Sequence, residues 1–485
     1  MKRWNLLCLT AALLLASCGS EAATAPEAET AAPAAETQAE TAAAEADTLA
    51  RYEQKDYGGQ VFRVIAGRDY LNTLDVFQFG VPEYAGDIVN DALMERDSRL
   101  QEYFNISIEY EDRFDTETYP YFSSLVTAGG SDVSMVLASI DLVFRPSMSN
   151  GLLYDLNDMP ELHLSEKWWD KNARKDFGIG DSIYGAGGSI TTRCVLAPWA
   201  LFFNTQLLTG HDLSSPYEMV KNGTWTLDAM TALMKDMGAD LDGNSTITAV
   251  DQAGLAVEVG GDYAFFGSAG GRICTSDGET IVPCFNTEKN ITLISKLRDM
   301  LLGPDTLSQK NYTTYESNTM FKENRTLFYC AALCDMVLLR DMKTDFGIVP
   351  LPKENEEQKE YYSFGNQWIG TVAVVPISVP DPSFAGTIMD AMAALSYETS
   401  LPAEYEITLQ NKQTRDETSA GMLRLIVENL TWDWGHVMGF GGIRDQINTA
   451  LRSNKDTIAS SFAKKEAAAQ KDIEKFTAVF MEEQS

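Results

Sequence analysis

The 485-residue chain is 45% hydrophobic and 10% aromatic, which argues against a disordered protein and provides enough length for two or three domains. Its formal net charge of −32 argues against a nucleic-acid partner, because binding phosphates requires clustered Lys and Arg. The acidic composition instead favours solubility and repulsion from anionic membranes.

The N-terminus has the pattern of a secretion signal. Lys2 and Arg3 form a basic start, and the apolar stretch at 6–16 is too short to span a bilayer. It ends in the sequence LASC at 15–18, which resembles a bacterial lipobox. The pattern predicts cleavage before Cys18 and a lipid on its sulfur. An ordinary signal peptide with a chance cysteine is the alternative.

Residues 18–56 are predicted to form a solvated tether. After Cys18 this segment is dominated by Ala, Thr, Glu and Pro, and up to residue 50 it contains no Lys or Arg. Such a composition cannot bury a core. A tether that follows a lipid anchor would hold a folded domain away from the membrane, so we expect the anchor to be the membrane contact.

A βαβ pattern opens the folded part of the chain. Residues 61–65 form a short apolar strand, 88–104 carry apolar side chains on one helical face, and 106–110 alternate as a second strand. A strand, a helix and a strand at this spacing predict parallel pairing in an α/β sheet.

A further strand is predicted at 133–137, and Ser139 and Asp141 follow it closely. Ligands of open α/β sheets bind at the carboxyl ends of the strands. We therefore treat Ser139 and Asp141 as candidate ligand contacts.

The segment 194–237 is predicted to form a buried strand at 200–204, a connection and a capped helix. Thr226 precedes apolar residues spaced three to four apart, and a Thr at this place can accept a hydrogen bond from a free backbone N–H of the helix. Gly238 stands where a helix C-cap is expected. Trp225, beside the cap, is assigned to packing.

The loop from Asp240 to Asp251 has the oxygen spacing that Ca²⁺ requires. With Asp240 as position one, side-chain oxygens fall at positions three, five and twelve, and position seven offers its backbone carbonyl. Ser245 replaces the usual Gly at position six, and Asp replaces the usual Glu at twelve, as in the dockerin-type loops that this stretch resembles. The predicted structural calcium ligands are Asp240, Asp242, Asn244, Thr246 and Asp251. A polar turn without metal is the alternative.

Apolar patterns predict further elements after this loop. They are helical or buried segments at 293–302 and 321–339, strands at 345–352 and 371–376, helical faces at 384–395 and 422–430, and a final helix at 456–482. Five cysteines follow Cys18, and this odd number leaves at least one of them unpaired within the chain. No disulfide pairing is assigned.

Common catalytic motifs are absent from the sequence. It contains no G-x-G-x-x-G, no phosphate-binding loop, no H-E-x-x-H and no G-x-S-x-G. A catalytic carboxylate pair does not stand out among the 70 acidic residues. We therefore expect no cofactor for chemistry and no enzymatic activity.

Several blocks of sequence resemble the extracellular solute-binding lipoproteins of carbohydrate-type ABC transporters, the broad family that includes maltose-binding protein. The more specific blocks are FFNTQLL at 202–208 and the Thr-Trp block at 216–230. The others lie at 240–255, 345–352 (DFGIVPLP), 372–376 (VAVVP) and 402–423. Together they extend over most of the chain between residues 57 and 430.

The resemblance implies an α/β, type II periplasmic-binding-protein-like fold with two lobes joined by crossing hinge strands. After the signal peptide (1–17) and the tether, it places 57–197 plus 349–397 in lobe 1 and 198–348 plus 398–485 in lobe 2. The solute would bind between the lobes, and an ABC permease would recognise the closed form. We also expect a monomer on the extracytoplasmic side of the cell membrane.

A sugar suits the residue types near the predicted crossings, because pyranose faces stack on aromatic rings while hydroxyls hydrogen-bond to polar side chains. The predicted ligand-binding residues are Ser139, Asp141, Trp199, Asn366, Trp368, Trp432 and Trp434. For each Trp, burial in the core is an equal alternative. Peptides, polyols and other polar solutes are alternative ligands, since the fold serves many.

The predicted function is therefore a lipid-anchored binding protein that captures a mono- or oligosaccharide for an ABC importer. Two alternatives are a lipid-anchored carbohydrate-active enzyme and a sensory or adhesion lipoprotein of the same fold. Turnover of oligosaccharides would identify the enzyme. Neighbouring permease genes would argue against the sensory or adhesion protein.

Overall fold

The computed structural model describes residues 47–68, 78–130, 132–276, 279–311, 314–410, 417–455 and 457–481. The predicted signal peptide, Cys18 and the tether up to residue 46 lie outside these residues. Residues 47–485 form one unit, separate from 1–46. No helix in the described ranges combines the length and the apolar character that crossing a bilayer requires.

The first sheet contains four strands in the order β14-β3-β1-β2. β1 (Gln60–Arg68) pairs in parallel with β2 (Ile106–Phe114), and α1 (Ile88–Phe104) connects them, so the predicted βαβ unit is confirmed. β3 (Met135–Ser139) runs parallel to β1, and β14 (Thr371–Val374) closes the sheet antiparallel to β3. The sheet is therefore mixed, with its one antiparallel strand at the edge.

Helix α1 forms because its first turn is capped and one face is apolar. The Asp87 carboxylate accepts hydrogen bonds from the N–H groups of Val89 and Asn90. Val89, Leu93, Leu100 and Phe104 are buried, as is Arg96. Ile88, predicted on the buried face, is 37% exposed because it occupies the first turn on the solvent side.

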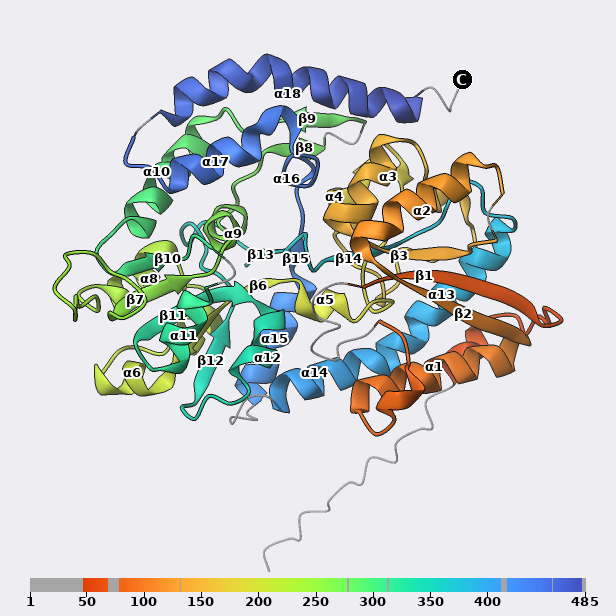
Figure 1. Cartoon of the computed structure of the whole chain (residues 1–485), viewed down its shortest axis with the longest axis horizontal. Coiled ribbons are helices and arrows are strands. Elements are labelled where there is room, and N and C mark those ends of the chain that lie inside the picture. The colour runs from red at the N-terminus through yellow and green to blue at the C-terminus, as the bar shows by residue number, and fades with distance from the viewer. Residues whose placement is uncertain are drawn as a thin grey trace, which may run out of the picture. The chain divides into compact units, whose positions relative to one another are not determined.

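The second sheet contains five strands in the order β10-β7-β11-β6-β12. β6 (Trp199–Asn204) is buried throughout and pairs antiparallel with β11 (Thr326–Ala332) on one side and β12 (Phe346–Val349) on the other. β7 (Ala253–Val257) and β10 (Thr306–Ser308) complete it with parallel pairing. The two sheets and their helices form the two α/β lobes of the molecule (Figure 1).

The helix predicted after Thr226 is α8 (Leu227–Met234), and the Thr226 hydroxyl accepts the N–H of Ala229 as expected. The predicted C-cap at Gly238 is wrong, because the helix ends four residues earlier. The N–H of Gly238 instead donates to the Asp305 carboxylate at 2.7 Å. A side chain at position 238 would overlap the carbonyl oxygen of Pro304, so glycine is required for this close approach.

Most later predictions agree with the structure. Phe384, Ile388, Met392 and Leu395 share the buried face of α13 (Pro382–Glu398), and the final helix is α18 (Ile458–Met481). Leu430 does not belong to a helical face: α15 (Glu417–Glu428) ends before it, and the residue forms β15 (Leu430–Thr431). Trp225 is fully buried and donates to the carbonyl of Pro350 at 2.9 Å, which confirms its packing role.

The other elements have these bounds: α2 (Asp115–Thr127), α3 (Arg145–Ser149), α4 (Ala173–Phe177), β4 (Gly178–Ile179), β5 (Ser182–Ile183), α5 (Arg193–Leu196), α6 (Thr205–Gly210), α7 (Pro216–Lys221), α9 (Gly261–Ser268), β8 (Cys274–Ser276), β9 (Ile281–Pro283), α10 (Glu288–Leu301), α11 (Glu316–Lys322), α12 (Met336–Leu339), β13 (Ser363–Phe364), α14 (Ser400–Gln410), α16 (Trp434–Met438) and α17 (Ile443–Leu451). The short helical turns are η1 (Thr48–Arg51), η3 (Pro82–Tyr84), η4 (Ile140–Phe144), η5 (Leu156–Asp158), η6 (Leu333–Asp335) and η7 (Phe440–Gly442). The five cysteines after Cys18 are free thiols.

Helix α18 covers α17, η7 and β9 along one edge of the molecule (Figure 1). Its last turns also reach the β4–β5 hairpin region, where the rings of Phe480 and Tyr184 lie 4.7 Å apart. The backbone next to Tyr184 belongs to the first lobe, since the N–H of Ala186 donates to Ala373 in β14. The C-terminal helix therefore packs on both lobes.

Candidate functional site

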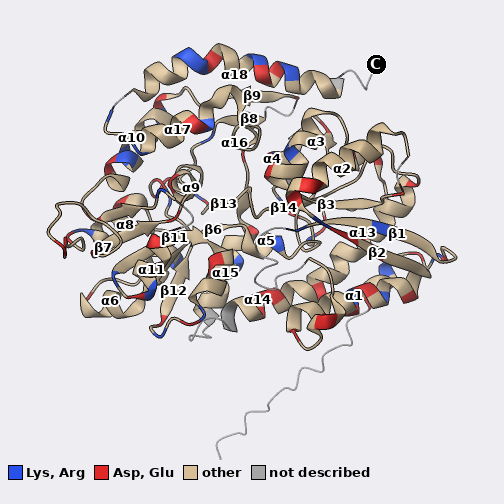
Figure 2. Ribbon diagram, in the orientation of Figure 1, with Lys and Arg blue, Asp and Glu red and all other residues tan. Residues whose placement is uncertain are grey.

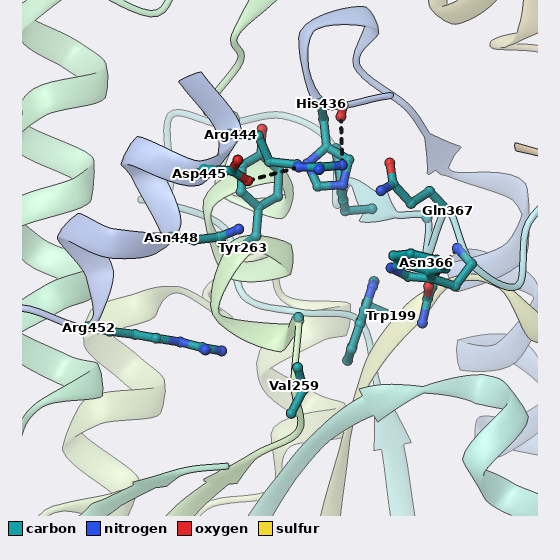
Figure 3. A pocket seen from close by; sticks show the side chains of 14 residues that line it. Trp199, Val259, Tyr263, Asn366, Gln367, His436, Arg444, Asp445, Asn448 and Arg452 are labelled. Carbon is teal, nitrogen blue, oxygen red and sulfur yellow. Dashed lines mark hydrogen bonds and ion pairs between the residues drawn. The ribbon is translucent and has the colours of Figure 1, made fainter. Parts of the chain in front are cut away.

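A cavity of about 270 Å³ lies where two chain segments pass between the lobes. Pro198, just before β6, pairs antiparallel with Gly365, and the N–H of Asn366 donates to the carbonyl of Ala197 at 2.8 Å. The cavity is lined by Trp199, Val259, Gly260, Tyr263, Phe364, Gly365, Asn366, Gln367, Trp368, His436, Arg444, Asp445, Asn448 and Arg452 (Figure 3).

Aromatic side chains form one part of the lining. Trp199 and Tyr263 are 4% and 2% exposed, whereas Trp368 is 58% exposed at the mouth. Gly260 has a φ of +97°, and a side chain there would contact the Trp199 ring at 3.2 Å. Glycine thus lets the start of α9 approach the indole closely. The result is a set of rings with an exposed aromatic at the entrance.

Helix α17 supplies a polar wall opposite these rings. Arg444, Asn448 and Arg452 follow at intervals of four residues and so lie on one helical face. The Arg452 guanidinium is ion-paired with the Asp262 carboxylate, which is 1% exposed. Arg444 contacts the Asp445 carboxylate and the His436 carbonyl, each at 3.5 Å (Figure 3).

Three buried polar atoms of the lining have no hydrogen-bond partner among the described residues. They are the Tyr263 hydroxyl, Nδ1 of His436 and Oε1 of Gln367. A buried polar group without a partner costs about 1–3 kcal/mol. Burial, and then the charge of Arg444, hold the pKa of His436 well below its usual range, so its imidazole is neutral at pH 7. These groups can therefore offer hydrogen bonds to a polar ligand.

Of the predicted ligand-binding residues, Trp199, Asn366 and Trp368 line the cavity. Oδ1 of Asn366 accepts the N–H of Trp368 at 3.0 Å and orients the loop that carries the exposed indole. Gln367, between them, is 3% exposed. The fold thus brings Trp199 and the 366–368 loop, distant in sequence, into one cavity.

Ser139 and Asp141 lie behind this loop and do not line the cavity. The Asp141 N–H donates to the Gln367 carbonyl at 3.3 Å, and its carboxylate is ion-paired with Arg145 at 3.1 Å. Ser139 is 4% exposed. Asp141 therefore touches the lining through Gln367.

Trp432 and Trp434 are both 4% exposed and lie in the core outside the lining. The Trp432 ring packs so closely on Gly365 and Gly370 that a side chain on either glycine would overlap it. Trp434 packs on Phe144, with ring centroids 6.1 Å apart. These two residues therefore pack in the core, which was the alternative to ligand contact.

Sequence reasoning missed Tyr263, His436, Arg444, Asn448 and Arg452. The four-residue spacing of the last three along a helix was visible in the sequence. The neighbouring sequence does not show that this polar face lines a cavity and is not in solvent. The contact that positions it, between Arg452 and Asp262, joins residues about 190 positions apart.

The predicted calcium loop brings carboxylate oxygens of Asp240, Asp242 and Asp251 within 4.8 Å of one another. Ser245, at the position where glycine is usual, has a left-handed φ of +67°, so the loop makes the expected turn. The Asp251 carboxylate also accepts the N–H groups of Leu241 and Thr248. Oδ1 of Asn244 accepts the N–H of Thr246 at 2.9 Å.

No known family profile matches the sequence, and no match was found among curated proteins. Solved structures do match. M. tuberculosis UspC is 15% identical, with a TM-score of 0.56, over 84% of this chain and 99% of its own. A cyclo/maltodextrin-binding protein complexed with maltotetraose is 13% identical, with a TM-score of 0.55, over 88% and 97% of the two chains.

A third match is the maltose/maltodextrin-binding domain MalE of Bdellovibrio bacteriovorus bound to maltotriose. It is 16% identical, with a TM-score of 0.52, over 85% of this chain and 100% of its own. The chain therefore has the two-lobed, type II fold of the maltodextrin-binding-type solute-binding proteins. At these identities the likeness concerns the fold.

Proposed function

We propose that this chain is an extracytoplasmic binding protein that captures a carbohydrate between its lobes and delivers it to an ABC importer. One observation carries the proposal. At the crossing of the two lobes, a cavity combines aromatic rings with buried polar groups that lack partners among the described residues. Two solved proteins of this fold are bound to maltotriose and maltotetraose, which supports the same ligand class.

The cavity suits the two-sided chemistry of a sugar. Trp199, Tyr263 and Trp368 offer rings on which the apolar face of a pyranose can stack. Gln367 and His436 offer hydrogen-bonding atoms that no residue in the described ranges satisfies. Micromolar affinity needs about 8 kcal/mol, which a few stacked rings and satisfied hydrogen bonds supply.

Delivery would use the hinge motion of the two lobes, with the closed, ligand-bound form presented to the permease. We further propose a lipid anchor on Cys18, a monomeric state and a structural Ca²⁺ in the Asp240–Asp251 loop. The lipobox-like sequence supports the anchor. The convergence of three carboxylates supports the metal.

The enzyme alternative is less well supported. Glycoside hydrolysis uses two carboxyl groups that flank the scissile bond. Among the residues that line the cavity, Asp445 supplies the single carboxylate, and its side chain is 71% exposed. Binding without turnover therefore fits the lining better than hydrolysis does.

Calorimetry of the purified chain against mono- and oligosaccharides tests the proposal. We expect saturable binding with micromolar or tighter affinity and an intact saccharide afterwards by chromatography. Products of hydrolysis would establish the enzyme alternative. Failure of every saccharide to bind would overturn the proposed function. Binding by a protein whose gene deletion leaves uptake unchanged would favour a sensory or adhesion role.

A further inference from the structure

The charge of the cavity lining is opposite to that of the chain. The whole sequence has 70 acidic and 38 basic residues, and the acidic ones are spread over helices of both lobes (Figure 2). The lining instead carries Arg444 and Arg452 against one acidic residue, Asp445. An excess of guanidinium groups at this cavity of an acidic protein calls for a specific explanation.

One edge of the Arg452 guanidinium is held by Asp262, and its other edge has no hydrogen-bond partner in the part of the chain that the structure describes. Its Nε donates to the Asp262 carboxylate, which is 1% exposed and lies behind the wall. The guanidinium extends from this ion pair toward the cavity, and its side chain is 34% exposed (Figure 3). Since a guanidinium has five N–H donors, this arrangement leaves donors for a ligand.

Arg444 is held more loosely. Its contacts to the Asp445 carboxylate and the His436 carbonyl are both 3.5 Å, at the outer limit for a hydrogen bond. Asp445 itself is largely solvated. An acceptor placed in the cavity could therefore replace these weak contacts with stronger ones.

The helix that carries Arg444 is anchored in the core. Helix α17 buries Ile443, Ile447 and Leu451 on the face next to that of Arg444 and Asn448. Positions 444 and 452 are about 12 Å apart along a helix axis, given a rise of 1.5 Å per residue. Because the two side chains leave the backbone about two helical turns apart, they suit two acidic groups on one extended ligand.

We propose that the solute is an anionic oligosaccharide, with one acidic group against Arg452 and a second against Arg444. This inference rests on the proposed carbohydrate-binding function. A hydroxyl both donates and accepts, so a neutral sugar gains equally from acceptors and donors. A carboxylate or sulfate only accepts, and charge-assisted bonds to Arg are roughly twice as strong as neutral ones.

The net charge of the chain does not oppose this assignment. At physiological ionic strength, charges more than about 8 Å apart are largely screened. The ligand would therefore respond to the arginines that it touches and much less to distant acidic residues. His436 adds no charge, because its imidazole is neutral, and Asp262 is already paired.

Calorimetry with three trisaccharides of equal length tests the inference: an oligogalacturonate, a sulfated saccharide and an uncharged galactose oligomer. We expect an anionic probe to bind at least 10-fold more tightly than the neutral one, and to lose affinity as NaCl rises from 50 to 500 mM. Comparison of the oligogalacturonate with the sulfated saccharide shows whether the site prefers a carboxylate or a sulfate.

Variants locate the effect. Arg444→Gln and Arg452→Gln should each weaken the anionic probe about 10- to 100-fold and weaken the neutral probe by a clearly smaller factor. Because Arg452→Gln leaves Asp262 unpaired, the double variant Arg452→Gln/Asp262→Asn separates lost binding from lost folding. Arg424→Gln, on the exposed face of α15, should change neither affinity.

The outcomes separate the two proposals. Equal or tighter binding of the neutral trisaccharide would overturn the anionic assignment and leave the proposed function standing. Unchanged affinity of the anionic probe in both single arginine variants would also overturn it. If none of the three probes and no other saccharide binds, the proposed function itself fails.

Discussion

Tyr52 donates a hydrogen bond of 2.7 Å to the carboxylate of Asp390, which lies 338 residues later in the chain. Asp390 is fully buried and also accepts the indole N–H groups of Trp168 and Trp169 at 3.1 and 2.9 Å. One carboxylate therefore joins η1, the 163–169 segment and α13.

Replacing Asp390 with Ala should destabilise the protein by about 3–5 kcal/mol, because it leaves several buried donors without an acceptor. Urea unfolding followed by tryptophan fluorescence measures the change. Tyr52→Phe removes one hydrogen bond and should cost about 1 kcal/mol. If Asp390→Ala lowers the free energy of unfolding no more than Tyr52→Phe does, the carboxylate does not stabilise all three segments.

Trp368 and Trp432 offer a matched pair of substitutions. Trp368→Ala should weaken saccharide binding about 10-fold or more and leave the midpoint of unfolding nearly unchanged, because its indole is 58% exposed at the cavity mouth. Trp432→Ala should cost about 3–5 kcal/mol of stability, because its ring is buried against Gly365 and Gly370. Calorimetry and urea unfolding measure the two effects; unchanged affinity in Trp368→Ala would remove this residue from the site.

Calcium should raise the melting temperature if the Asp240–Asp251 loop binds it, since a ligand of the native state stabilises by mass action. Differential scanning fluorimetry with CaCl₂ against a chelator measures the shift. Asp240→Ala should abolish it, whereas Asp299→Ala, at an exposed position outside the loop, should not. A shift that persists in Asp240→Ala would place the calcium elsewhere.

Stability should fall as pH rises from about 4 to about 7. Burial, and then the nearby Asp170 carboxylate, raises the pKa of Asp176 to about 7. Between the unfolded and folded pKa values the native state holds a proton that the unfolded chain has lost, so this stabilisation disappears as pH rises through 7. The loss is on the order of 2–4 kcal/mol.

Unfolding in urea at pH 5 and pH 8 measures this effect. In the wild type the Trp432 N–H lies 2.7 Å from the Asp176 carboxylate. Asp176→Asn keeps an oxygen that can accept this N–H, and it should flatten the dependence of stability on pH. A pH profile identical to that of the wild type would show that another group is responsible.

The fold was largely predictable because its elements depend on local patterns. The βαβ unit follows from two apolar runs and one apolar helical face, and the Thr226 cap from a side chain that bonds within its own turn. The C-cap prediction at Gly238 was wrong because it relied on the same local patterns. Its role is set by Pro304 and Asp305, some 67 residues away, and no local rule contains that contact.

The site was predictable only in part. Trp199 lies at the first predicted crossing and Trp368 just before the predicted strand at 371–376, and both line the cavity. Trp432 is also a tryptophan in a predicted loop, yet two glycines from another loop cover its ring. Whether a tryptophan faces a ligand or the core is thus decided by what packs on it from elsewhere.

The contact between Phe480 and Tyr184 has a consequence for any hinge motion of the lobes. Separating the lobes would either pull α18 away from the first lobe and expose aromatic surface, or move the β4–β5 hairpin together with the helix. In the first case the newly exposed rings would oppose the separation, and this cost would not depend on a bound solute.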